Sequence, residues 1–107
     1  LMKEAAKKVK EGQWREAAVI WGAKFEEEKK AVNKAKIASN IALANECLDD
    51  IENAVKWIDI AYELLPEKEQ SEVRSLTMIY RGKLKVREKY VSVLKEQLGT
   101  DEESVGE

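Results

Sequence analysis

Residues 35–68 read AKIASNIALANECLDDIENAVKWIDIAYELLPEK, and this stretch decides the fold class. Its apolar and small residues recur at spacings of three and four, which places them on one face of a helix. Asp49 and Asp50 interrupt the pattern, and Asp50 is a good N-cap for a second helix. Pro66 follows that second helix, which its ring cannot continue. The stretch therefore predicts a helical hairpin.

Small side chains mark the place where the two helices of this hairpin cross. Ala42 and Ala54 leave room for a close approach, while Ile41, Ile51 and Ile58 fill the space around it. This pattern resembles a single tetratricopeptide repeat, a helix-turn-helix unit of about 34 residues. The matching positions are Ile41, Ala42, Ala44, the Asp49-Asp50 turn, Ile51, Ala54, Ile58, Ala61 and Pro66. The resemblance implies stacked helix pairs in which the first helix of each pair lines a concave groove.

A second, poorer copy of the repeat lies upstream, where Gly12 supplies a turn and Trp14 and Ala17 begin a helix. Downstream, the helical spacing passes through Gly82 without a change of phase, which favours one long capping helix. We therefore predict an all-α, tetratricopeptide-like domain of about two repeats over residues 1–98. Its parts are a hairpin at about 2–30, a hairpin at about 33–65, a long helix at about 67–98, and an acidic flexible tail at 99–107.

Composition narrows the classes of function. The chain has 107 residues, no His and a single Cys. This excludes His-based catalytic triads, most zinc sites and an intramolecular disulfide. Only scattered carboxylates and lysines remain, so we expect no enzyme activity, no cofactor and no metal. No apolar run is long enough to span a bilayer. The compartment stays open between the cytoplasm and a bacterial periplasm or envelope.

The resemblance also implies a groove that usually holds an extended peptide. In this chain the groove face would present Lys36, Ser39, Asn40, Leu43 and Cys47. Asn40 matches an asparagine with which some family members hold a peptide's terminal carboxylate. The upstream repeat has Met2 and Ala6 where such a clamp needs a Lys and an Asn, so a clamp of that kind is not expected. We predict a non-enzymatic module that binds a protein or peptide and acts as an interaction scaffold.

Charge and hydropathy single out the long helix as a second contact surface. Residues 46–72 carry nine acidic and two basic side chains, whereas residues 73–95 carry seven basic side chains and one acidic side chain. The basic face therefore has an acidic counterpart within the fold or between copies, and nucleic acid is not the expected partner. Because two repeats rarely bury a continuous core, self-association is one way to complete it. The near-heptad apolar line predicts a homodimer contact at Tyr80, Leu84, Arg87, Val91 and Leu94.

A second interpretation remains open. The small-residue pattern of residues 37–66, followed by a helix with Tyr80, Leu84 and Arg87, resembles the C-terminal helical part of bacterial surface lipoproteins. That resemblance implies a structural or assembly segment of a larger envelope protein with no ligand of its own. An open groove at Lys36 would favour peptide binding, whereas a long helix folded across the groove would favour the structural role.

Overall fold

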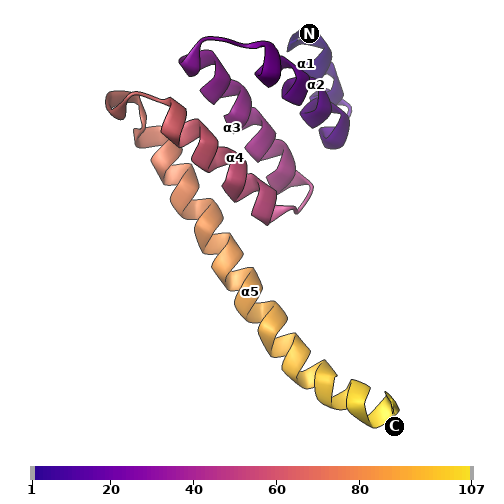
Figure 1. Cartoon of the computed structure of the whole chain (residues 1–107). Coiled ribbons are helices and arrows are strands. Elements are labelled where there is room, and N and C mark those ends of the chain that lie inside the picture. The colour runs from indigo at the N-terminus through magenta and orange to yellow at the C-terminus, as the bar shows by residue number, and fades with distance from the viewer. Residues whose placement is uncertain (1, 107) are drawn as a thin grey trace.

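The computed structural model describes the backbone of residues 2–106 and the side chains of residues 3–98. This part of the chain is helical and contains no strand, which confirms the all-α prediction (Figure 1). Helices that follow one another in the sequence pack together as two hairpins and a final long helix. The elements are α1 (Met2–Lys10), α2 (Trp14–Glu27), α3 (Ala31–Cys47), α4 (Ile51–Leu64), the 3₁₀ turn η1 (Glu67–Glu69) and α5 (Ser71–Gly106).

The first hairpin turns at Gly12, as the sequence predicts. Gly12 has a φ of 75°, in the left-handed region that glycine adopts without a steric penalty. The backbone N–H of Gln13 donates to the carbonyl oxygen of Lys8 at 2.8 Å, and that of Gly12 donates to Val9 at 3.0 Å. These two bonds satisfy carbonyls that the end of α1 leaves without helical partners.

The second hairpin uses the same turn without a glycine. Asp49 has a φ of 64°, and the backbone N–H of Asp50 donates to the carbonyl oxygen of Asn45 at 2.8 Å. The N–H of Asp49 donates to Glu46 at 2.9 Å, which completes the pair of bonds seen at Gly12. Asp50 then caps α4 as predicted, because its carboxylate accepts from the backbone N–H of Asn53 at 3.3 Å.

The turn from α4 to α5 is also held by a side chain. Nε2 of Gln70 donates to the carbonyl oxygens of Tyr62 at 2.9 Å and Leu65 at 3.2 Å, both at the end of α4. The α-helix then begins at Ser71, after the η1 turn, rather than at the predicted residue 67. It runs unbroken through Gly82.

The C-terminal bound of α5 also differs from the expectation, because the helix extends to Gly106 instead of ending near Leu98. The predicted acidic flexible tail at 99–107 falls on residues whose side chains lie outside the described part of the chain.

Within residues 3–98, two clusters of buried side chains form the core, and most of their members are small. The first lies between α3, α4 and the start of α5, and the second lies between α1, α2 and α3. Ala42 and Ala54 are both fully buried, as the predicted helix crossing requires. No charged or polar side chain of residues 3–98 is buried. The first cluster comprises Ala35, Ala38, Ala42, Ala54, Ile58, Ala61, Val73 and Tyr80.

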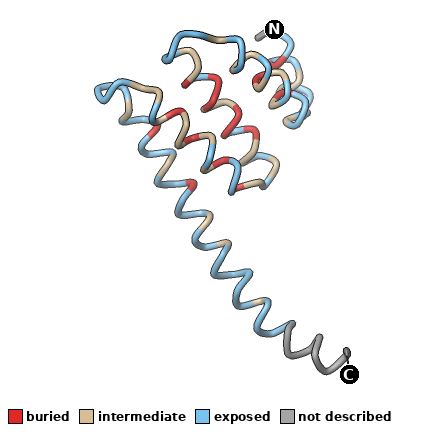
Figure 2. The backbone as a smooth tube through the Cα atoms, in the orientation of Figure 1, coloured by how far each residue is buried: buried red, intermediate tan, exposed pale blue. Residues whose placement is uncertain are grey.

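The helix α5 belongs to the core over only part of its length. It starts beside the N-terminal half of α3, runs in the same direction, and packs against α4 (Figure 1). Val73 and Tyr80 are buried there, whereas Leu76 is 36% exposed and lies off the packed face. Beyond the body, the described part of α5 is mainly exposed (Figure 2). The molecule is therefore elongated, with extents of 57 × 32 × 21 Å.

Candidate interaction surfaces

A hollow of about 680 Å³ opens between α3 and the start of α5, and we call it the α3 groove. One wall is the N-terminal half of α3, and the other is formed by the end of α4, the η1 turn and the first residues of α5. Its lining residues are Val32, Ala35, Lys36, Ser39, Asn40, Leu65, Lys68, Glu69, Ser71, Glu72 and Val73. The turn at Pro66 creates this arrangement, because it returns the chain to α3.

The structure brings together three of the five predicted groove residues. Lys36, Ser39 and Asn40 line the α3 groove. Leu43 and Cys47 lie further along α3 and are exposed outside the hollow. Helical spacing placed all five on a similar face, but only the first part of α3 faces the wall that η1 and α5 provide. Leu43 and Cys47 are therefore not part of this site.

The second wall was missed by the sequence analysis. Lys68 from η1 and Ser71 from α5 add a cation and a hydroxyl to the α3 groove, while Glu69 and Glu72 add two carboxylates. A signal was present in Pro66, since a chain that turns sharply after α4 must pass close to α3. The identity of the residues that reach the groove depends on the η1 turn, which the helical spacing did not reveal.

The polar side chains of the α3 groove have no partners among the described residues. No hydrogen bond or ion pair joins Lys36, Ser39, Asn40, Lys68 or Glu72 to another side chain. The floor beneath them is apolar, with Ala35 and Val73 both buried. Unpaired donors and acceptors above an apolar floor suit a ligand that has both a polar backbone and apolar side chains.

Among the described residues, three ion pairs fasten α5 to the body. Arg81 contacts the carboxylate of Asp59 at 2.7 Å. Lys83 pairs with Glu46, and Arg87 pairs with Asp49. The guanidinium of Arg87 lowers the pKa of the Asp49 carboxyl, and the carboxylate in turn raises the pKa of Arg87. Three basic side chains of α5 are therefore neutralised within the chain. The sequence indicated this, because the basic residues of 73–95 follow a segment rich in acidic residues.

The predicted dimer-contact residues divide into two groups. Tyr80 is only 3% exposed and belongs to the core, where burial raises the pKa of its hydroxyl. Tyr80 was therefore wrongly placed at an interface, because α3 and α4 already cover that turn of α5. Arg87 is held by Asp49. Leu84, Val91 and Leu94 remain on α5 where it leaves the body.

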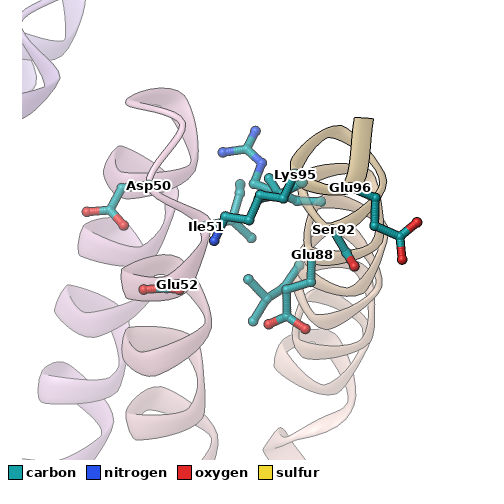
Figure 3. A pocket seen from close by; sticks show the side chains of 10 residues that line it. Asp50, Ile51, Glu52, Glu88, Ser92, Lys95 and Glu96 are labelled. Atoms are coloured by element: carbon teal, nitrogen blue, oxygen red, sulfur yellow. The ribbon is translucent and has the colours of Figure 1, made fainter. Parts of the chain in front are cut away.

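A second hollow, of about 730 Å³, lies at this point of departure, and we call it the junction hollow. The start of α4 forms one side, with Asp50, Ile51 and Glu52 (Figure 3). The other side is α5, from which Glu88, Ser92, Lys95 and Glu96 extend (Figure 3). Leu84, Arg87 and Val91 complete the lining. The hollow thus has apolar groups between two charged rims.

Metal binding and membrane insertion each require a particular feature of the described residues. Among the described residues, no group of three or more His, Cys, Asp or Glu side chains could hold a metal ion. None of the described helices has a stretch long and apolar enough to cross a membrane. The two larger hollows among the described residues are the α3 groove and the junction hollow.

Comparison with known proteins identifies a family. The family model of a domain of unknown function, DUF6340, matches residues 3–86. The chain belongs to the DUF6340 family. The matched part of this DUF6340 protein contains α1 to α4, the α3 groove and α5 as far as Val86. No curated protein and no solved structure matches the chain.

Proposed function

We propose that this DUF6340 protein is a non-enzymatic binding module of two tetratricopeptide-like hairpins. It holds an extended polypeptide segment in the α3 groove, between α3 and the beginning of α5. The observation that carries the proposal is the set of unpaired polar side chains above a buried apolar floor. Lys36 and Asn40 donate to the main-chain carbonyls of the segment, and Glu72 accepts from its N–H groups.

The shape of the groove supports an extended segment over a compact ligand. The groove follows one side of α3 from Val32 to Asn40 and is open to solvent on its outer side. Toward the other end of α3, the ion pair between Glu46 and Lys83 bridges α3 and α5. A segment lying along α3 therefore meets donors and acceptors from both walls in succession.

The position of α5 favours binding over a purely structural role. A structural segment would have its long helix folded across the face of Lys36 and Asn40. Instead α5 packs mainly against α4, and its first turn forms one wall of the α3 groove without closing it. The polar groups of the groove remain accessible to a partner.

A selection from a random peptide library displayed on phage tests the proposal with the 107-residue chain as bait. Enriched peptides are then synthesised, and their affinity is measured by fluorescence anisotropy. Replacing both groove donors, by Lys36→Ala with Asn40→Ala, should weaken binding at least about tenfold, because each lost hydrogen bond is worth about 1 kcal/mol. Amide shifts in NMR spectra should centre on residues 32–40 and 68–73.

The matched control is Lys56→Ala, which removes an exposed lysine of α4 outside both hollows. It should leave peptide affinity unchanged. A selection that enriches no peptide would contradict the proposal. Equal affinity of the enriched peptides for the wild-type chain and the double groove variant would contradict it as well.

A further inference from the structure

The packed face of α5 continues past the body, where the described residues of the helix are mainly exposed. Val73 and Tyr80 bury this face against α3 and α4. The same seven-residue spacing continues through Leu84, Arg87, Val91, Leu94 and Leu98. Val91 is 39% exposed and Leu98 is 52% exposed. A stripe that is core in the first half of the helix is thus left open in the second half.

Charge is distributed unevenly beside this open stripe. Glu88 and Lys95 flank it on the same side, one heptad apart and opposite in sign. They are two helical turns apart, too far to pair with each other, and neither makes an ion pair among the described residues. On the other side, Lys83 is already paired with Glu46, while Tyr90 and Gln97 are uncharged.

We propose that a second copy of this chain covers the stripe, with the two α5 helices antiparallel. In antiparallel pairs, flanking residues on the same side of each stripe face one another across the interface. Placing Val91 opposite Leu94 of the second copy brings Glu88 opposite Lys95, and Lys95 opposite Glu88. The helix carries its own complementary charge pattern, so both ion pairs form from one sequence.

The register follows from the position of Arg87. With Val91 opposite Leu94, Arg87 lies opposite Leu98 at the edge of the contact, where its guanidinium still reaches Asp49. A register shifted by one heptad would place Arg87 opposite Val91 near the centre, and it would put Glu88 opposite its own copy. That register buries a charge and sets like charges together, so it is disfavoured.

The junction hollow receives Leu98 of the second helix. Its apolar lining of Ile51, Leu84 and Val91 lies where Leu98 of the second copy arrives. A parallel arrangement would instead bring the two helical bodies to the same end, where the packed face of α5 is already covered by α4. The contact extends over residues 87–98 of each copy, about 18 Å of helix, which gives a small interface and a reversible dimer.

Analytical ultracentrifugation over a concentration series tests the dimer, in reducing buffer because the exposed Cys47 could form a disulfide between copies. The 12.2 kDa chain should approach twice its mass as concentration rises. Glu88→Lys and Lys95→Glu, each alone, should raise the dimer Kd roughly tenfold, because one reversal affects both symmetric pairs. The double variant with both reversals should return to within about threefold of the wild-type Kd.

The matched control is Lys89→Glu, which makes the same charge change as Lys95→Glu but on the far face of α5. It should leave the dimer Kd unchanged. A chain that stays monomeric at all concentrations overturns the proposal. A dimer that neither reversal weakens, or that the double variant fails to restore, overturns the antiparallel arrangement. The α3 groove is a separate surface, so peptide binding neither requires nor predicts any of these results.

Discussion

Arg87 on α5 donates hydrogen bonds to the main-chain carbonyl oxygen of Asp49, at 2.9 Å, and to its carboxylate. Asp49 is the residue that turns the chain from α3 into α4, with a φ of 64°. A non-glycine residue in this region carries a steric penalty. One side chain of α5 therefore supports a strained turn and fixes the place where α5 leaves the body.

We expect this contact to make stability depend on pH in the acid range. Arg87 holds the pKa of Asp49 below its ordinary value of about 3.9. The stabilisation is therefore complete above the unfolded-state pKa and is lost as pH falls through the lower folded-state pKa. Asp49→Asn keeps a residue that tolerates positive φ but removes this titration. Urea unfolding at stepped pH should show a smaller loss of stability below about pH 4 in the variant.

The comparison is made between variant and wild type because Glu28 also has a lowered pKa, caused first by the backbone N–H of Lys30. That carboxyl titrates in both proteins, so its effect cancels in the difference. Identical acid slopes for Asp49→Asn and wild type would show that Arg87 does not stabilise the ionised form.

Two glycines should respond in opposite directions to replacement by alanine. Gly82 lies within α5, and a Cβ built there meets nothing within 4 Å. Gly82→Ala should therefore raise the free energy of unfolding by about 0.5–1 kcal/mol. Gly12 has equal space but a φ of 75°, so Gly12→Ala should lower it by about 1 kcal/mol. Thermal and urea unfolding measure both, and a stabilising Gly12→Ala would contradict the turn geometry.

The crossing of α3 and α4 should not tolerate a larger side chain. Ala54 is fully buried against α3 and the start of α5. Ala54→Leu must displace packed neighbours and should cost about 1–3 kcal/mol or more. Ala23 on α2 is exposed, and Ala23→Leu should change stability by less than about 0.5 kcal/mol. Chemical unfolding measures the free energy of unfolding of both variants. Equal values for Ala54→Leu and Ala23→Leu would contradict a close crossing of α3 and α4.

The contribution of the Asp50 capping hydrogen bond to stability should be separable from the contribution of its negative charge. Asp50 accepts from the backbone N–H of Asn53 at 3.3 Å and from its side-chain amide at 2.7 Å. Asp50→Ala should lower the free energy of unfolding by about 1 kcal/mol, because it leaves a helix N–H without a partner. Asp50→Asn retains a capping oxygen and should cost less. Equal losses in the two variants would assign the effect to charge instead of capping.

The sequence predicted the fold well because the informative residues act locally. Gly12 and Asp50 end or begin helices through their own conformational preferences, and the spacing around Ala42 and Ala54 determines which faces meet. Helix bounds differed from the prediction at both ends of α5, which begins at Ser71 after the η1 turn and extends to Gly106. The left-handed turn at Asp49 was not predicted, because a non-glycine residue gives little local indication of positive φ.

The candidate sites were predicted only in part, because each is assembled from distant segments. Three groove residues followed from one helix face, but Lys68 and Ser71 reach the groove through a turn whose direction the spacing did not give. Charge balance indicated that α5 would face acidic residues. It did not indicate that Arg87 would pair with Asp49, since that pairing depends on which residue of α5 lies beside the α3–α4 turn.

The order in which the helices contact one another has a consequence for how the chain folds. Each helix packs mainly against its immediate neighbours in the sequence, so few long loops must close before contacts form, and rapid folding follows. The α3–α4 hairpin has neighbours on both sides, whereas α1 packs mainly on α2, and the described residues of α5 beyond the body are mainly exposed. Native-state hydrogen exchange should therefore be slowest in the central hairpin and faster toward both ends of the chain, because local unfolding starts from the terminal helices.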